Sequence, residues 1–332
     1  METTDTTHEQ DRQAVEQIAA SREKIEQELS RVIIGQKAAV EEILITLFAG
    51  GNCLITGVPG LAKTLMVRAI AGIFDLEFHR IQFTPDLMPA DITGTEILTD
   101  GEHGRELRFV KGPVFTNVLL ADEINRTPPK TQAALLEAMQ EKQVTVGGTS
   151  RELPKPFFVL ATQNPIEQEG TYPLPEAQLD RFLLQIDVDY PSLEAERQIL
   201  METTGTRDQH ASPVFTGEKL MKLQQLVRRM PVPESVVNAI LELVRSARPG
   251  TGHAATDAHV AWGPGPRASQ SLMLCSRARA LYEGRFAPSI DDVKALAEPV
   301  LQHRMALTFA ARAEGVSIRD VIADLVKSLD QA

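Results

Sequence analysis

Residues 52–65 read Asn-Cys-Leu-Ile-Thr-Gly-Val-Pro-Gly-Leu-Ala-Lys-Thr-Leu. The short apolar run Cys53–Ile55 has the length of a buried strand, and the residues after Thr64 have helical character. A glycine-rich loop between a strand and a helix, closed by a lysine and a hydroxyl residue, is typical of a phosphate-binding loop. Its glycines let backbone N–H groups converge on an anion, and the following helix points its positive end there. The sequence therefore predicts a nucleotide triphosphate site.

The last residues of this loop have separate predicted roles. Lys63 is expected to reach the β- and γ-phosphates, and the Thr64 hydroxyl is expected to ligate Mg²⁺. Ala62 stands where the general loop pattern has a third glycine. Alanine fits there if its φ angle is negative, and we predict that it is. A glycine-rich turn alone is more often only a turn, so the prediction depends on the lysine-threonine pair.

A second motif lies at residues 117–123, which read Asn-Val-Leu-Leu-Ala-Asp-Glu. Its apolar residues predict a buried strand with two carboxylates at the carboxyl end, where parallel α/β sheets bind ligands. Asp122 is expected to hold Mg²⁺, often through water, and Glu123 to polarise a water for attack on the γ-phosphate. The alternative is a strand that ends in solvated acids, which the phosphate loop disfavours. A nucleotide switch needs only the aspartate, whereas a hydrolase also needs a base.

Two weaker signals complete the predicted site. Asn164 ends the apolar run that starts at Phe157, and its amide would orient the attacking water if the two strands are neighbours. An asparagine at a strand end is, alternatively, only a turn former. The segment Ile33-Ile34-Gly35-Gln36 precedes a predicted helix over 37–48 and lies about twenty residues before the phosphate loop. It is predicted as an adenine-contacting turn, or otherwise as a core segment with a helix start.

The remaining pattern predicts an α/β fold with a three-layer αβα core, a five-stranded parallel sheet and β-hairpin insertions, followed by an all-helical lid. The expected units are 1–30, a tail and helix; 31–190, the nucleotide-binding core; and 191–332, the linker and lid. Residues 1–10 are read as a loose tail. Thr127 is expected to cap the helix that Pro128 and Pro129 open. Predicted strands are 53–55, 78–83, 117–123, 157–164 and 182–188; predicted hairpins span 95–110 and 144–153; predicted helices after Ser192 are 192–204, 217–229, 233–247, 267–283, 289–303 and 317–329.

Composition limits the classes of protein. The chain has 332 residues, of which 43% are hydrophobic, and a net charge of −11. The hydrophobic share supports a real core. The negative charge argues against the diffuse phosphate attraction of non-specific nucleic-acid binding. No apolar stretch approaches the ~20 residues of a membrane span, so a cytoplasmic protein is expected. Cys53 and Cys275 are the only cysteines, and a disulfide framework is not expected.

Together these segments resemble the AAA+ ATPase superfamily and, within it, the MoxR family, from Val32 to about Val326. Residues 57–64 are similar to the family's own Walker A loop, including the alanine that breaks the general pattern. Residues 119–126 are similar to its Walker B stretch. The two predicted hairpins resemble inserts shared with magnesium chelatase and the replicative MCM helicases.

Three further segments carry the resemblance. Residues 161–165 resemble sensor 1, which implies Asn164 as the sensor. Residues 172–182 resemble the segment that carries an arginine finger, which implies Arg181. Residues 262–268 resemble the sensor 2 motif, which implies Arg267, acting either within its own subunit or across an interface. His253 and His259 with Asp257 lack a fourth ligand at a recognised spacing, so a metal site there is not expected.

The resemblance implies an Mg²⁺-dependent ATP hydrolase that works as a homo-oligomeric ring, a hexamer, and activates or remodels client proteins. Such clients often contain a von Willebrand factor A domain; no nucleic acid and no membrane span are expected. The predicted catalytic residues are Lys63, Glu123, Asn164, Arg181 and Arg267. The predicted ATP-binding residues are Ile33, Ile34, Gly35, Gln36, Gly57, Val58, Pro59, Gly60, Leu61, Ala62, Lys63, Thr64, Leu65 and Asp122, with Thr64 and Asp122 as Mg²⁺ ligands.

Other functions remain open at this point. An ATP-switched binding module would use the same loop without turnover. A helicase-like nucleic-acid motor would share the inserts, but the acidic balance and the absence of a dense basic stripe with stacking aromatic residues count against it. A chelatase motor would need companion subunits.

Overall fold

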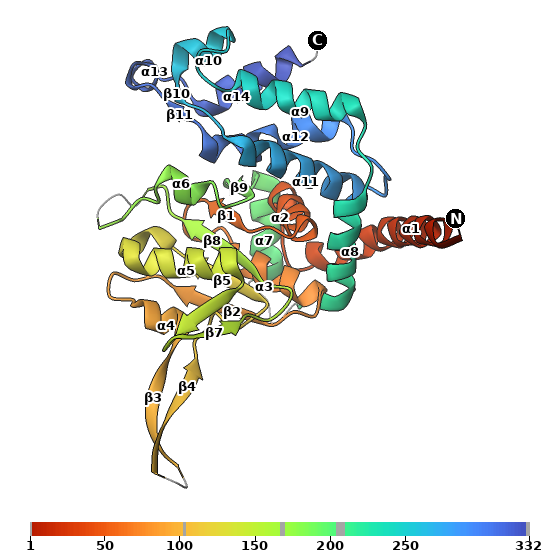
Figure 1. Cartoon of the computed structure of the whole chain (residues 1–332). Helices are drawn as coiled ribbons and strands as arrows, with labels where there is room; N and C mark the ends of the chain where they lie inside the picture. Colours follow the sequence, from red (N-terminus) through yellow and green to blue (C-terminus); the bar gives the residue numbers. More distant parts are fainter. Residues whose placement is uncertain (1, 102–103, 167–169, 204–209, 330–332) are drawn as a thin grey trace.

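The computed structural model describes residues 2–101, 104–166, 170–203 and 210–329. In Figure 1 a mostly helical lid stacks above an α/β core, and one β-hairpin extends away from the core on the side opposite the lid. The predicted α/β fold with a five-stranded parallel sheet is confirmed.

The central sheet is parallel throughout, with the spatial order β2-β5-β8-β1-β9. Its strands are β1 (Cys53–Thr56), β2 (Phe78–Gln82), β5 (Val118–Asp122), β8 (Phe158–Gln163) and β9 (Leu184–Asp187). β8 lies between β5 and β1, so the strand that ends near Asn164 separates the two strands that carry the predicted acids and the phosphate loop. In open parallel sheets, ligands bind outside the carboxyl ends of the strands, in the crevice where the loops from neighbouring strands diverge.

Alternate residues of each strand face opposite layers, as the period of two requires. Ile55, Leu120 and Leu160 pack into one apolar cluster with the helices on their side. Leu119 and Val159 pack into the other cluster, with α5. The sheet is therefore buried on both faces, which explains the unbroken apolar runs in its strands. The core helices are α2 (Lys37–Ala49), α3 (Lys63–Ile73), α4 (Pro89–Thr93), η1 (Ile124–Arg126), α5 (Pro129–Glu141) and α6 (Glu176–Leu179).

The start of α5 differs from the prediction. Pro128 occupies the N-cap position and Pro129 the first helical position, and the Thr127 hydroxyl is buried with no hydrogen-bond partner among the described residues. Thr127 is therefore one residue too early to cap the helix. The reason is the proline pair, because a residue before proline avoids the helical region, so Pro128 stays extended and the helix begins only at Pro129.

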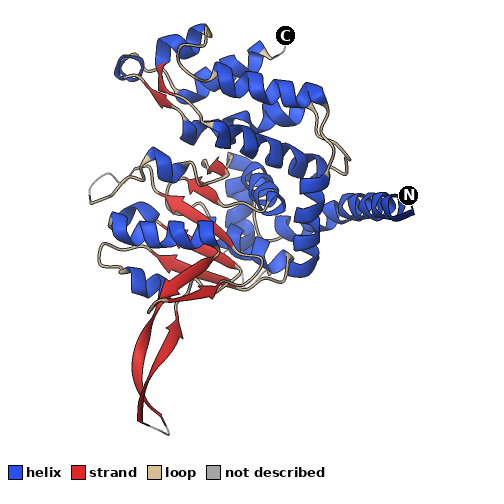
Figure 2. Cartoon of the chain, in the orientation of Figure 1, coloured by secondary structure: helices blue, strands red, loops and turns tan. Residues whose placement is uncertain are grey.

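Both predicted hairpins are present as antiparallel pairs, coloured red in Figure 2. The longer one joins β3 (Gly94–Gly101) to β4 (Gly104–Lys111), and the shorter one joins β6 (Gln143–Val146) to β7 (Thr149–Glu152). Glu96 and Arg151 form an ion pair at 3.2 Å between Oε1 and Nη2, and the Arg151 guanidinium lies 4.0 Å from the centroid of the Phe109 ring. The two insertions are thus joined at the base of the longer hairpin, whose distal half stands free (Figures 1 and 2).

Among the described residues after Ser192, the regular elements are helices except for a short antiparallel pair, β10 (Val260–Trp262) with β11 (Ala306–Leu307). The prediction of helices only was wrong for these strands, which are two and three residues long and pair across more than forty residues of sequence. The helices are α7 (Leu193–Thr203), α8 (Gly217–Arg229), α9 (Glu234–Ser246), α10 (Ala254–His259), α11 (Pro266–Tyr282), α12 (Ile290–Leu301), η2 (Gln302–Arg304), α13 (Phe309–Ala313) and α14 (Ile318–Ser328).

The N-terminal segment is a single helix, α1 (Glu2–Ser30), so the predicted loose tail over residues 1–10 was wrong for residues 2–10; residue 1 lies outside the described part. The apolar residues that predicted a helix after Asp11 do face the core: Ile18 and Ile25 are fully buried. Cys53 and Cys275 are buried free thiols, as expected.

Candidate functional site

The phosphate loop connects β1 to α3, and its two glycines are needed for different reasons. A Cβ on Gly57 would lie 2.7 Å from the Val188 carbonyl oxygen, so the end of β9 approaches the loop too closely for a side chain. Gly60 has φ +89°, which favours glycine. The first turn of α3 contains no acidic residue, so its N–H groups and positive end face an anion without competition.

Ala62 corrects a prediction, because its φ is +57° rather than negative. It is the N-cap residue of α3, and the chain enters the helix through a left-handed turn there. This conformation costs an L-residue ~1 kcal/mol. Packing of the α3 face that contains Met66 and Ile70 into the core offsets that cost.

The Lys63 amine donates a hydrogen bond to the Gly57 carbonyl oxygen, so the lysine side chain folds back over its own loop. Partial burial lowers the pKa of Lys63, and the charges of Asp122 and Glu123 oppose that shift. The phosphate loop follows β1 and the two acids stand at the end of β5, so both lie at the carboxyl edge of the parallel sheet, with β8 between their strands.

Asp122 is held by two groups that the sequence did not indicate. The Thr162 hydroxyl donates to its Oδ1 at 2.6 Å, and Arg80 donates to its Oδ2 from Nε at 3.0 Å and from Nη2 at 2.6 Å. Thr162 belongs to β8 and Arg80 to β2, so the strands on both sides of β5 orient this carboxylate.

Glu123 leaves the strand in a left-handed conformation, with φ +58°. Its N–H donates to the Thr162 hydroxyl at 2.9 Å, which fixes the turn. Its Oε2 accepts a hydrogen bond from Gln82 Nε2 at 2.7 Å and another from Arg126 Nη1 at 2.9 Å. A non-glycine residue in this region is a strained feature that the surrounding contacts must hold, and such residues cluster at functional sites.

Asn164 follows β8, the strand between β5 and β1, and is 5% exposed. Its side-chain oxygen accepts a hydrogen bond from the Ile166 N–H at 3.1 Å. It therefore forms a local turn, which was the alternative interpretation, while lying at the same sheet edge as the acids. The two interpretations are compatible, because the hydrogen bond orients the amide at that edge.

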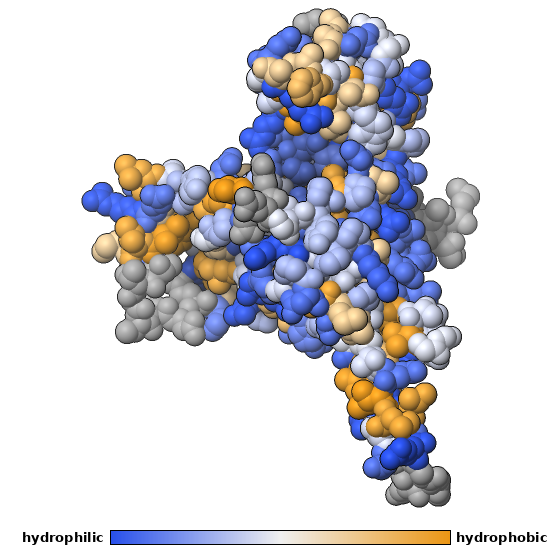
Figure 3. Space-filling model, turned by 90° about the vertical axis from the view of Figure 1, so that its left-hand side faces the viewer, coloured by the Kyte–Doolittle hydropathy of each residue, from blue (hydrophilic) through white to orange (hydrophobic). Residues whose placement is uncertain are grey.

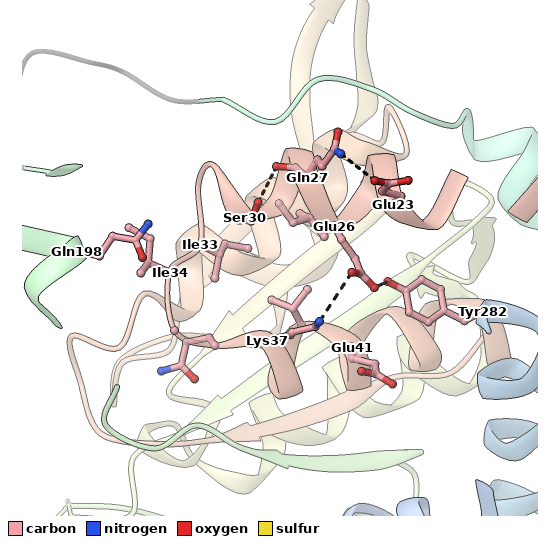
Figure 4. A pocket seen from close by; sticks show the side chains of 14 residues that line it. Glu23, Glu26, Gln27, Ser30, Ile33, Ile34, Lys37, Glu41, Gln198 and Tyr282 are labelled. Atoms are coloured by element: carbon pink, nitrogen blue, oxygen red, sulfur yellow. Dashed lines mark hydrogen bonds and ion pairs between the residues drawn. The ribbon is translucent and has the colours of Figure 1, made fainter. Parts of the chain in front are cut away.

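The predicted adenine turn lies against the chain that leaves β9. Gln36 Nε2 donates to the Asp189 carbonyl oxygen at 2.9 Å, and a Cβ on Gly35, whose φ is +78°, would lie 2.7 Å from Ala195 Cβ. Ile33 and Ile34 also line a cavity of about 460 Å³ between α1 and α2, which Figure 4 shows. In it Glu26 forms an ion pair with Lys37 and accepts a hydrogen bond from the Tyr282 hydroxyl. This cavity does not include the phosphate loop.

A different cavity, of about 330 Å³, does border the phosphate loop. Gly57, Val58 and Leu61 line it together with Tyr190, which follows β9, and Arg319, which comes from the lid helix α14. Arg319 also forms ion pairs with Asp187 and Glu298. Sequence reasoning missed Tyr190 and Arg319, because neither belongs to a local motif.

The two predicted arginines lie away from the phosphate loop of their own chain. Arg181 is exposed, and its guanidinium has no hydrogen-bond or ion-pair partner within the described part of the chain. Arg267, which is half-exposed, has its Nη1 3.6 Å from the Asp180 Oδ2. Both line one cavity of about 270 Å³. The structure therefore groups Arg267 with Arg181.

The remaining signals are structural. Asp257 accepts hydrogen bonds from the N–H groups of Gly250 and Gly252, so it orders a turn. Within the described residues, no group of three or more histidines, cysteines or acids is arranged to hold a metal ion. The same residues contain no helix long and apolar enough to cross a membrane.

The chain is similar to known proteins over most of its length. Residues 52–184 match the model of the ATPase family associated with various cellular activities, and residues 253–325 match that of the AAA lid domain. The chain is 45% identical to the chaperone MoxR1 of Mycobacterium tuberculosis over 297 residues, which cover 89% of this chain and 78% of that protein. It is 30% identical to the protein MoxR of Methylorubrum extorquens, over 86% of this chain and 87% of that protein. The chain belongs to the MoxR family of AAA+ ATPases.

A solved structure agrees with this assignment. The MoxR-family chain is 40% identical to a candidate ATPase from Cytophaga hutchinsonii, with a TM-score of 0.88 over 95% of this chain and 96% of that one. The core and the lid together thus have the fold of that solved structure.

Proposed function

We propose that this MoxR-family chain hydrolyses ATP at the sheet edge where β1 and β5 end. The observation that carries the proposal is a shared sheet edge: the phosphate loop with Lys63 follows β1, Asp122 and Glu123 stand at the end of β5 in the same parallel sheet, and the helix N-terminus after the loop is free of acids. A lysine and a helix end attract the triphosphate, and an additional carboxylate supplies the base that hydrolysis needs. Asn164, at the end of the intervening strand, would orient the attacking water.

Mg²⁺ fits the residues present. The Thr64 hydroxyl makes no hydrogen bond within the described chain, and the Asp122 carboxylate stands at the same edge of the sheet, at the end of β5. Oxygen donors of this kind, completed by phosphate oxygens and water, suit Mg²⁺, so a cluster of three protein ligands is not needed. The ion would supply neutralisation of phosphate charge. Lys63 would leave the Gly57 carbonyl and bind the β- and γ-phosphates, and Glu123 would take the proton of the water.

The base is tested by Glu123→Gln, which keeps the size of the side chain and removes its basicity. Turnover is expected to fall by about 10²–10⁴-fold, since that is the usual contribution of a general base. Binding of a fluorescent ATP analogue should persist. Glu137→Gln, on the exposed face of α5, is the matched control and should turn over ATP at the normal rate. Undiminished hydrolysis by Glu123→Gln would remove this residue from its role.

We further propose a ring, with six subunits, in which Arg181 reaches the nucleotide of the next subunit. Two features support this: the Arg181 guanidinium is exposed and unpaired in the described chain, and Arg267 lies beside it rather than beside the phosphate loop. A finger residue in such a position contributes ~10³–10⁵ in rate. Assemblies that mix Lys63→Ala with Arg181→Ala subunits should recover activity above either parent. Mixtures that never recover would exclude a shared site.

The client of this ATPase is proposed to be a protein. The relative from Mycobacterium tuberculosis is named a chaperone, and the β3–β4 hairpin presents a projecting surface (Figure 1). A partner with a von Willebrand factor A domain is the class that the family resemblance favours, and we propose the cytoplasm as the compartment and 1–30, 31–190 and 191–332 as the working units. Capture of clients by the ATP-bound Glu123→Gln form, followed by mass spectrometry, tests the client class; recovery of nucleic acid alone would contradict it.

A further inference from the structure

Arg304 lies in η2 of the lid and is 1% exposed, yet all five of its N–H groups have acceptors. A guanidinium has five donors in a fixed planar arrangement, so complete pairing fixes its surroundings as well as itself. The acceptors come from three parts of the chain. They are Asp180 Oδ1 at 2.7 Å, the Asp180 carbonyl at 3.4 Å, the Phe182 carbonyl at 2.6 Å, the Leu183 carbonyl at 3.2 Å, the Val300 carbonyl at 2.6 Å and the Ser271 hydroxyl at 3.2 Å.

Four of these acceptors, two of them on Asp180, belong to residues on either side of Arg181. Asp180 precedes it, and Phe182 and Leu183 follow it, in the short connection between α6 and β9. The neighbouring His303 adds a hydrogen bond between its Nε2 and the Phe182 carbonyl at 3.1 Å. The backbone on both sides of the exposed Arg181 side chain is therefore bound from the lid by η2.

This set of contacts is more than the lid needs to stay attached to the core. One continuous apolar cluster already joins them, with Phe48 and Ile43 of α2 against Leu272 and Tyr282 of α11. Burying a charged guanidinium is costly unless it is fully paired, so hydrophobic side chains would serve attachment equally well. What the arginine adds is local: it orders the polar backbone of residues 180–183.

Asp180 also contacts a second arginine of the lid, Arg267. Asp180 accepts from Arg304 through Oδ1 and lies 3.6 Å from Arg267 Nη1 through Oδ2. Arg304 belongs to η2 and Arg267 to the start of α11, and both elements are part of the lid. A single carboxylate thus joins the segment that carries Arg181 to two lid arginines, one buried and one half-exposed.

We propose that Arg304 is a positioning residue for Arg181: by holding Asp180, Phe182 and Leu183, it sets the direction in which the Arg181 guanidinium is presented to the neighbouring subunit. This inference rests on the proposed function, in which Arg181 acts across a subunit interface. It makes the lid of one subunit a determinant of turnover at the site of the next, because a shift of η2 moves the backbone on both sides of Arg181.

The test compares Arg304→Lys with Arg181→Ala in assembled protein. Lysine keeps the positive charge but can reach only some of these acceptors. Residues 180–183 therefore lose the rigid, five-donor guanidinium that holds them. Because a displacement of about 1 Å costs about 100-fold, kcat should fall by that order while KM for ATP stays within about twofold. The double variant with Arg181→Ala should turn over as slowly as Arg181→Ala alone, because both changes affect one interaction.

Mixed assemblies locate the defect. Arg304→Lys subunits combined with Lys63→Ala subunits should regain activity, because the latter cannot bind nucleotide but present an intact Arg181. A defect in the variant's own nucleotide site would not be regained this way and would overturn the inference. Gln302→Ala is the matched control and should leave kcat within about twofold. Gln302 donates a hydrogen bond to the Gln185 carbonyl in β9, which lies outside residues 180–183. An equal loss in that control would show general loosening of the lid instead.

Two further outcomes are distinguished. If thermal unfolding shows that Arg304→Lys does not fold, Asp180→Asn takes its place, because it keeps the shape of the acceptor and removes its charge; the same kcat loss and the same recovery are expected. Wild-type kcat in a folded Arg304→Lys or Asp180→Asn protein overturns the inference alone. Wild-type kcat in Arg181→Ala, by contrast, overturns the proposed role of Arg181 and this inference with it.

Discussion

Gln82 hydrogen-bonds the carboxylate of Glu123, with 2.7 Å between Nε2 and Oε2. The contact follows from strand register, because Gln82 and Asp122 are directly paired on β2 and β5, which places Gln82 beside the turn at Glu123. A base that is held in this way must break the contact before it reaches a water at the phosphate.

We therefore expect Gln82→Leu to raise basal ATP turnover. A hydrogen bond to a charged group is worth about 1.5–3 kcal/mol, and solvent at this partly exposed pair reduces it to about 1 kcal/mol. Without this stabilisation of the ground state, the activation free energy falls by the same amount, which corresponds to an increase in turnover of about fivefold. Steady-state hydrolysis without client measures it. A decrease of similar size would show instead that Gln82 positions Glu123 for the reaction.

Ala62 leads to a prediction about stability. Its φ of +57° strains alanine, whereas glycine adopts that angle freely but loses more entropy on folding. The two effects nearly cancel, so Ala62→Gly should change the free energy of unfolding by no more than about 1 kcal/mol and keep ATP binding. Ala62→Val should destabilise by about 1–2 kcal/mol, since a branched side chain suits this region worst. Urea denaturation measures both; equal stability of the valine variant would contradict the strain argument.

The pKa of Glu42 in α2 is raised from 4.5 to about 7, chiefly by burial and further by the charges of Asp187, Glu298 and Glu41. Between these pH values the folded chain holds a proton that the unfolded chain has released, so stability falls as pH rises from about 4.5 to 7 and is then level. The full penalty is about 3 kcal/mol.

Glu42→Gln should therefore remove much of the decline in unfolding free energy between pH 5 and 8, and should be more stable than the parent chain at pH 8. Chemical denaturation at several pH values measures both quantities. Glu137→Gln, exposed on α5, is the control and should keep the parent slope. A Glu42→Gln protein with the parent's slope would show that other groups produce the decline.

The sequence predicted those features that short segments determine. The phosphate loop, the acids at the end of β5 and the hairpins each depend on a few adjacent residues, so these elements and their functional side chains could be placed from the sequence. The residues that hydrogen-bond those side chains come from elsewhere in the chain. Arg80 and Gln82 reach Asp122 and Glu123 through a strand pairing that spans forty residues, and no local pattern indicates it.

Conformation inside loops was equally hidden from the sequence. The sign of φ at Ala62 depends on how α3 docks on the sheet, which local propensity does not describe. Arg304 was missed for a similar reason: a single arginine at the end of a helix is usually a surface residue, and only the fold brings Asp180 to it across 124 positions. Long-range polar contacts of this kind are specified by the tertiary structure as a whole.

The longer hairpin separates stability from function along its length. Near its base Arg151 packs on Phe109 and pairs with Glu96, so Arg151→Ala should lower the free energy of unfolding by about 1–2 kcal/mol. Farther out, Leu98 and Leu107 are direct partners on one face and are 58% and 68% exposed. Figure 3 shows this apolar surface on the hairpin between its base and its tip.

We expect Leu98→Ser with Leu107→Ser to change unfolding free energy by less than about 0.5 kcal/mol, because exposed side chains contribute little to stability. The same double variant in the Glu123→Gln background should lose most of its captured client, since the apolar contact surface is gone. Basal ATP turnover of the double variant should match the parent chain, because neither leucine lies near the sheet edge that holds the acids. Undiminished client capture by the double variant would place the client surface elsewhere on the molecule.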